Sequence, residues 1–107
     1  MESTIQQLAL EFKQSLKELY GRRFGKLILF GSHARGDWNE ESDVDFLVIL
    51  NDEHIKGGTE VGFLSSVVGD LCLKYNKLVS YLPVSDSRYQ TSQSLFYKNV
   101  RKEGLVI

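Results

Sequence analysis

The chain has one cysteine, one proline and one methionine among its 107 residues. A single cysteine cannot form an internal disulfide, which favours a reducing cytoplasm as the location. This residue, Cys72, stands in an apolar stretch with helical spacing, so core packing is favoured over a reactive thiol. No apolar run approaches the roughly 18 residues of a membrane span, and the N-terminal MESTIQQ lacks a signal-peptide pattern. We therefore expect a cytoplasmic protein without a membrane segment.

The chain also has no large excess of positive or negative charge, because 13 basic and 14 acidic residues give a net charge of −1. Binding to a nucleic-acid backbone needs clustered positive charge, so no direct nucleic-acid partner is expected. The average hides one acidic segment. Between residues 31 and 45, a single base, Arg35, faces five acids: Asp37, Glu40, Glu41, Asp43 and Asp45. Such a cluster repels itself unless cations occupy it, which indicates a metal site.

The length suits one hydrophobic core, so we expect a single domain over residues 1–107. Apolar residues at helical spacing predict helices over residues 4–20, about 59–75 and about 92–103. Ser3 with Gln6 forms a capping box for the first helix, and Gly21 ends it. Short apolar runs predict strands over residues 26–30, 44–50 and 78–84, with a short helix and a loop within 32–42. This order predicts an α/β domain with a small mixed sheet of three or four strands flanked by helices.

The segment GSHARGDWNEESDVD, residues 31–45, contains most of the functional information. Alternate residues of a strand point to the same face, and a strand rises about 3.3 Å per residue. Asp43 and Asp45 should therefore project together, with Cα atoms roughly 6–7 Å apart. Two carboxylates at this spacing can share divalent cations, as in phosphoryl-transfer sites. Gly31 permits close backbone approach, and the Ser32 hydroxyl with nearby N–H groups can hold phosphate. The pattern therefore predicts a metal–nucleotide site.

These residues resemble the signature of the minimal nucleotidyltransferase (MNT) family, within the DNA polymerase β-like nucleotidyltransferase superfamily. Gly31-Ser32 and Asp43-Val44-Asp45 stand at the two halves of that signature, and Ser42 also matches the family pattern. The resemblance implies a polymerase β-like fold and a reaction that moves a nucleotide from ATP to a hydroxyl with Mg²⁺. It implies Asp43 and Asp45 as catalytic metal ligands, for one or two ions, and Gly31, Ser32, Arg35 and Ser42 as nucleotide-binding residues.

Several of these residues have structural alternatives. Ser32 can act as a helix N-cap as well as a phosphate ligand, and for Arg35 an ion pair with Asp37 or Glu41 is as well supported as a phosphate contact. For His33 a solvent-facing side chain is favoured over a ligand or base. Trp38 is evenly balanced between packing onto the protein and contacting a nucleobase or a partner.

A third carboxylate is the point at which the resemblance fails. Active members of the superfamily usually carry one on a later strand, and the corresponding segment here, residues 77–83, contains no acid. Ser80 stands at about the expected position, and an unactivated hydroxyl is too weak a base at neutral pH to replace a carboxylate. This departure affects catalytic competence more than nucleotide or metal binding.

The resemblance also implies a partner, because stand-alone MNT proteins commonly pair with a small HEPN protein in toxin–antitoxin systems. Two hypotheses follow. The first is an antitoxin that transfers AMP from ATP to a hydroxyl, by analogy a tyrosine, of a HEPN toxin. The second is a catalytically inactive nucleotide-binding antitoxin that neutralises the toxin by direct contact. The sequence leaves the nucleotide preference, Mg²⁺ versus Mn²⁺, and homo-oligomerisation open.

Overall fold

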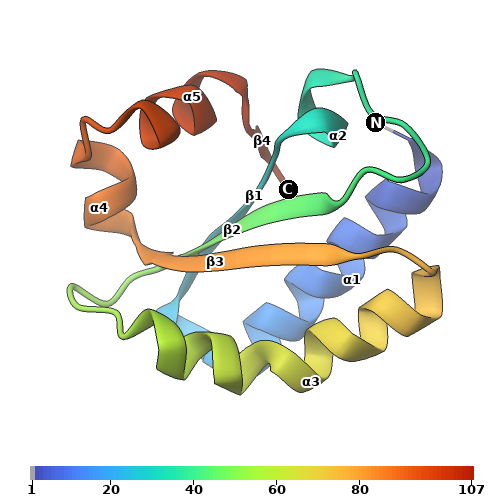
Figure 1. Cartoon of the computed structure of the whole chain (residues 1–107). Coiled ribbons are helices and arrows are strands. Elements are labelled where there is room, and N and C mark those ends of the chain that lie inside the picture. The colour runs from blue at the N-terminus through green and yellow to red at the C-terminus, as the bar shows by residue number, and fades with distance from the viewer. Residues whose placement is uncertain (1) are drawn as a thin grey trace.

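A computed structural model describes residues 2–107, and every statement below refers to this range. Its centre is a four-stranded sheet in the order β3-β2-β1-β4 (Figure 1). Strand β1 (Phe24–Phe30) runs antiparallel to β2 (Val44–Leu50) and to β4 (Leu105–Val106), whereas β3 (Val79–Ser85) runs parallel to β2. The predicted mixed sheet is confirmed, and its fourth strand is a two-residue segment too short to recognise from sequence.

Helices cover both faces of this sheet. Helices α1 (Ser3–Tyr20) and α3 (Gly57–Tyr75) pack on one face, with α3 below the strands in Figure 1 and α1 passing behind them. Helix α3 is the crossover that the parallel β2–β3 pair requires. Above the sheet lie the short α2 (Ser32–Arg35), α4 (Asp86–Thr91) and α5 (Leu95–Glu103). A 3₁₀ turn over Gly21–Arg23 joins α1 to β1. Within residues 2–107, no helix is long and apolar enough to cross a membrane.

Two details of the predicted helices are wrong. The N-cap of α1 is Glu2, whose carboxylate accepts a hydrogen bond from the Thr4 amide at 2.9 Å. Ser3, the predicted N-cap, is therefore the first residue of the helix. The last predicted helix, residues 92–103, begins three residues later, as α5 over Leu95–Glu103, and the short α4 over Asp86–Thr91 was not predicted. The Ser94 side chain caps α5, and α4 precedes it with its own Ser85 cap.

Strand β2 separates two hydrophobic clusters, which explains its nearly continuous apolar sequence VDFLVIL. Side chains at even positions of this strand, from Val44 to Leu50, pack among the residues of α1 and α3. Leu47 and Ile49 instead pack with α4 and α5 on the opposite face. Because side chains alternate along a strand, Asp45 belongs to the α4–α5 face.

A polar cluster fixes the end of the sheet at which β1 begins. The buried Glu60 on α3 accepts a hydrogen bond from the Tyr20 hydroxyl and one from Arg23, each at 2.7 Å. Arg23 also pairs with Asp52 at 3.0 Å. Burial together with the bond to Glu60 raises the pKa of the Tyr20 hydroxyl, so this hydroxyl stays a donor at neutral pH. These contacts join α1, α3 and the β2–α3 connection.

Candidate functional site

The two predicted acids lie at the beginning of β2. Asp43 is exposed and immediately precedes the strand, whereas Asp45 is half-buried within it. Asp45 pairs with Phe30 of β1 on one side and with Ser80 of β3 on the other. The site therefore occupies the end of the sheet where β1 finishes and the parallel strands β2 and β3 begin, on the face that carries α4 and α5.

Gly31 lies directly against the Asp45 carboxylate. Its backbone has φ +75° and ψ −155°, a region open almost only to glycine. A Cβ atom added at this position would overlap the Asp45 Oδ2 atom. The position thus requires glycine for two separate reasons, and the Gly-Ser turn and the Asp-x-Asp strand of the predicted motif meet at this contact.

The Asp45 carboxylate is poorly compensated. Burial raises its pKa, the neighbouring charge of Asp43 raises it further, and His33 and Arg35 oppose the change only from a distance. Among the described residues neither Asp43 nor Asp45 has a side-chain hydrogen bond or ion pair. Raised carboxylate pKa values without a structural partner are typical of functional sites. The pair is thus free to bind a cation.

Backbone hydrogen bonds hold the turn that follows β1. The Gly31 carbonyl accepts hydrogen bonds from Ala34 at 3.1 Å and Arg35 at 3.0 Å, and the left-handed Gly36 closes the turn. The amides of Ser32 and His33 are not part of this set of bonds. Because α2 has only four residues, its dipole is small, so any phosphate contact depends on the Ser32 hydroxyl and on these two amides.

Arg35 lies at the edge of the site and pairs with two acids. Its Nε atom is 3.2 Å from Asp37, as one of the predicted alternatives required, and its Nη1 atom is 3.8 Å from Glu103. Glu103 is 68 positions away on α5, and no local sequence signal points to this contact. All three side chains are substantially exposed, so both pairs are weak and can exchange for a phosphate.

The loop between α2 and β2 has its own internal order. Ser42 accepts a hydrogen bond from the Asn39 amide at 2.9 Å, and Asn39 accepts one from the Glu41 amide at 2.8 Å. The predicted nucleotide-binding Ser42 thus shapes the loop that leads into Asp43. Sequence reasoning gave no sign of this role.

The predicted exposure of His33 is wrong. This residue is buried, and its ring stacks on Trp38 with centroids 5.4 Å apart and an angle of 19° between the planes. Its Nε2 atom lies 3.4 Å from the Ser42 carbonyl oxygen. Trp38 packs onto the protein through one face and remains 38% exposed, which holds the loop against α2.

Ser80 occupies the position at which a third carboxylate was expected. It pairs with Asp45 across the parallel β2–β3 ladder, and its side chain is exposed. Among residues 2–107, no three histidine, cysteine or acidic side chains gather closely enough to form a metal site by themselves. Asp43 and Asp45 still fit a hard cation such as Mg²⁺, provided that phosphate oxygens and water complete its coordination.

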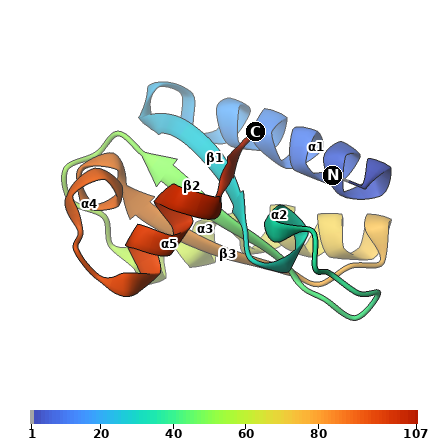
Figure 2. The same cartoon turned by 90° about the horizontal axis from the view of Figure 1, so that it is seen from above.

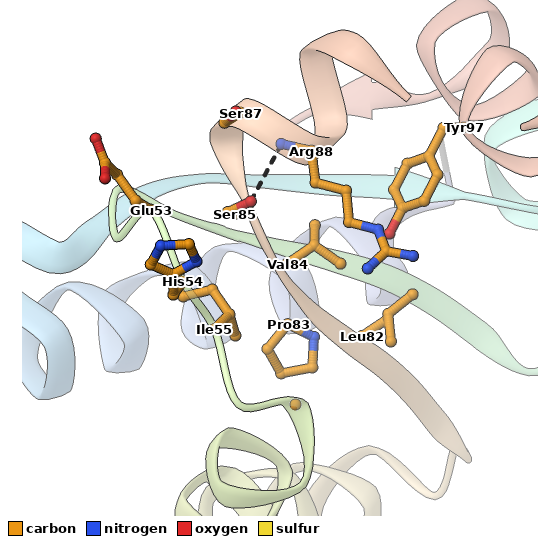
Figure 3. Close-up of a pocket in the computed structure, with 11 residues that line it drawn as sticks. Glu53, His54, Ile55, Leu82, Pro83, Val84, Ser85, Ser87, Arg88 and Tyr97 are labelled. Carbon is orange, nitrogen blue, oxygen red and sulfur yellow. Dashed lines mark hydrogen bonds between the residues drawn. The ribbon is translucent and has the colours of Figure 1, made fainter. Parts of the chain in front are cut away.

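A cavity of about 540 Å³ lies at the opposite end of β3, away from residues 31–45 (Figure 3). Pro83 and Val84 form part of its wall, and the Arg88 guanidinium lies 5.8 Å from the Tyr97 ring centroid. None of the predicted site residues lines it. The candidate site is therefore defined by the contact of Gly31 with Asp45 and by their sequence neighbours Ser32 and Asp43, and the size of this cavity is irrelevant to it.

Comparison with known proteins identifies the class. The family model described as "Nucleotidyltransferase domain" matches residues 10–102, so the chain belongs to the nucleotidyltransferase domain family. The chain is 35% identical over 98 residues to "Putative protein adenylyltransferase MJ0604" of Methanocaldococcus jannaschii, with 91% of each chain covered. A second relative from that organism, "Putative protein adenylyltransferase MJ0141", is 36% identical over 70 residues, or 65% of this chain and 69% of the relative.

Solved structures agree on the fold. A chain of a toxin–antitoxin crystal structure with AMP-PNP aligns with a TM-score of 0.60 at 18% identity, covering 90% of this chain and 70% of that one. A structure described as "a putative nucleotidyltransferase from Sulfolobus solfataricus" aligns with a TM-score of 0.64 at 15% identity, covering 96% and 81%. The resemblance inferred from residues 31–45 is confirmed: this is a nucleotidyltransferase fold that is similar in sequence to named adenylyltransferases.

Proposed function

We propose that the protein is an antitoxin-type nucleotidyltransferase that transfers AMP from ATP to a hydroxyl, by analogy a tyrosine, of a HEPN toxin. The observation that carries this proposal is the contact between Gly31 and the half-buried, uncompensated carboxylate of Asp45. It joins the two halves of the motif in space. The names of the curated relatives support AMP transfer to protein, and the toxin–antitoxin structure of similar fold supports the biological setting.

In this proposal Asp43 and Asp45 are the catalytic and metal-binding residues. One or two Mg²⁺ ions between them would neutralise charge on the phosphates and the pyrophosphate leaving group. Ser32 and the first amides of α2 hold the distal phosphates. Arg35 exchanges one of its acidic partners for phosphate, and Ser42 positions the loop. The acceptor hydroxyl forms the new bond to the α-phosphorus as the bond to pyrophosphate breaks.

Among residues 2–107, no third carboxylate stands beside Asp45 to take the proton of the acceptor hydroxyl. Ser80 stands beside Asp45, and its hydroxyl is too weak a base at neutral pH. The proton therefore passes to water or to a group that the partner brings. We propose residues 1–107 as a single nucleotidyltransferase domain, with its acceptor on another molecule. We propose the cytoplasm as the location of this reaction, because ATP is available there and a lone cysteine such as Cys72 stays reduced.

The position of Ser80 also favours a second candidate. Without a third acid, the same fold can bind nucleotide and neutralise a HEPN partner by contact alone. The two candidates differ in one respect, which is whether label moves from ATP to the partner.

The test is to incubate the chain with ATP labelled at the α-phosphate, Mg²⁺ and the cognate HEPN protein. We expect label on the partner, loss of it with Asp43→Asn or Asp45→Asn, and no effect of Asp70→Asn, an exposed acid on α3 that serves as the matched control. Peptide mapping then identifies the acceptor residue. Tight complex formation without label would refute the enzyme and support the contact mechanism.

A further inference from the structure

A second, smaller cavity opens beside the motif. It measures about 240 Å³ and lies between the end of β1, the turn of α2 and one side of α5. Helices α2 and α5 are neighbours above the end of β1 (Figures 1 and 2). The cavity is lined by Phe30, Gly31, Arg35, Phe96, Asn99, Val100 and Glu103.

Two residues of the cavity wall are direct neighbours of Asp45 in the candidate site. Gly31 forms part of its wall and also lies against the Asp45 carboxylate. Phe30 forms another part and is the β1 partner of Asp45 in the sheet. A nucleotide whose phosphates lie at Gly31 and Asp45 would therefore have its remaining part close to this cavity.

Two aromatic rings and one amide stand among the lining residues. The Phe30 and Phe96 rings meet edge to face, with centroids 5.5 Å apart and planes at 88°, and Phe96 remains 41% exposed. The Asn99 side chain is exposed and has no hydrogen bond within the described part of the chain. The volume lies below the roughly 300–1,000 Å³ of pockets that enclose whole drug-sized ligands, and it therefore suits a single ring system.

Charge determines which part of a nucleotide fits. Glu103 lies at the rim and repels phosphate, while its partner Arg35 stands on the side of the Gly31-Ser32 turn. The polarity of the cavity thus directs the triphosphate towards α2 and an uncharged ring towards α5.

We propose that this cavity is the adenine subsite of the nucleotide, and this inference rests on the proposed function. The base stacks on Phe96, as bases stack on exposed aromatic side chains in proteins that bind single strands. The Asn99 amide donates to adenine N7 and accepts from the N6 amino group, a bidentate pairing that guanine cannot form because its O6 is an acceptor. The structure thereby assigns a preference for ATP over GTP to one residue of α5.

The test compares binding of Mg-ATP, Mg-GTP and Mg-tripolyphosphate by isothermal titration calorimetry. We expect Phe96→Ala to weaken ATP binding about 5- to 100-fold and Phe96→Trp to retain it. Asn99→Ala should reduce the preference for ATP over GTP about 5- to 100-fold. Lys98→Ala, an exposed neighbour on α5 outside the cavity, is the control. Tripolyphosphate, which has no base, should bind all four variants equally.

The outcomes separate this inference from the proposed function. If wild type binds ATP, Asp45→Asn abolishes binding, and both Phe96→Ala and Asn99→Ala bind ATP and GTP as wild type does, the adenine subsite is refuted while the nucleotidyltransferase proposal stands. If wild type binds neither ATP nor tripolyphosphate, both are overturned. Asn99 is exposed, so its variant keeps the test decisive even if Phe96→Ala disturbs packing against Phe30.

Discussion

Gly31→Ala is the substitution that probes the candidate site most directly, because one methyl group has two separable effects. The first effect is backbone strain at φ +75°, ψ −155°, a conformation that costs a residue other than glycine about 1–3 kcal/mol. The second is overlap of the new Cβ with the Asp45 Oδ2 atom. Inserting an atom into a tightly packed position costs roughly 1–3 kcal/mol more. We therefore expect a total destabilisation of about 2–6 kcal/mol.

Gly36 is the matched control for the strain. It also has a positive φ, +89°, and a Cβ added there meets nothing within 4 Å. Gly36→Ala should therefore cost only the left-handed strain, about 1–2 kcal/mol. An Asp45→Ala background removes the overlapping oxygen and leaves the Asp45 Cβ at an ordinary 3.5 Å from the new methyl group.

The assay is urea denaturation of wild type and of each glycine variant, with and without Asp45→Ala. We expect Gly31→Ala to be less costly in the Asp45→Ala background, with a coupling free energy of about 0.5–3 kcal/mol, and Gly36→Ala to cost the same in both. An equal cost of Gly31→Ala in the two backgrounds would contradict the inferred contact. It would mean that the turn and the acid strand are not in contact.

Three further predictions concern charged and polar groups. Asp45→Asn should abolish Mg-ATP binding yet stabilise the free protein at neutral pH. The pKa of Asp45 is raised in the folded state from its ordinary value of about 3.8. The stability of wild type relative to the variant should therefore fall as the pH rises from below 3.8 through the folded-state pKa, and denaturation across pH 3–7 measures this fall. Ser80→Asp places a third acid beside Asp45 and should tighten Mg²⁺ binding in calorimetry, whereas Ser87→Asp, an exposed site beyond the end of β3, should not. Glu60→Ala should cost about 1–3 kcal/mol in thermal unfolding because the buried Tyr20 hydroxyl loses its acceptor while Arg23 keeps Asp52, and ATP affinity at temperatures well below the unfolding midpoint should stay as in wild type.

The local pattern of apolar residues in the sequence was sufficient to predict most of the helices and strands. Apolar spacing predicts α1 and α3, and nearly uniform apolar runs predict the three long strands, because burial on one face or two leaves a periodic trace in sequence. The final segment was harder. Helix α4 spans six residues and β4 two, and such short elements depend on caps and on contacts with β1 that periodicity does not record.

The surroundings of individual side chains were harder to predict from the sequence. The burial of His33 follows from stacking on Trp38. Exposure was the natural expectation for a histidine in this polar segment, and packing of Trp38 onto the protein was one of two balanced alternatives. Phe96 and Asn99 of α5 line the cavity beside the motif. In the sequence alone they are only part of one side of an amphipathic helix. Their relevance comes from where the helix packs.

The sequence alone predicted the chemistry of the candidate site, because a Gly-Ser turn and two acids one residue apart specify backbone access and paired carboxylates through local geometry. Tertiary structure decided how these parts meet. Antiparallel pairing of β1 with β2 brings Gly31 against Asp45, and parallel pairing with β3 brings Ser80 to the other side. Strand register and helix packing are set by contacts between residues tens of positions apart, and for that reason neither the closeness of Gly31 to Asp45 nor the cavity beside them could be derived from local pattern.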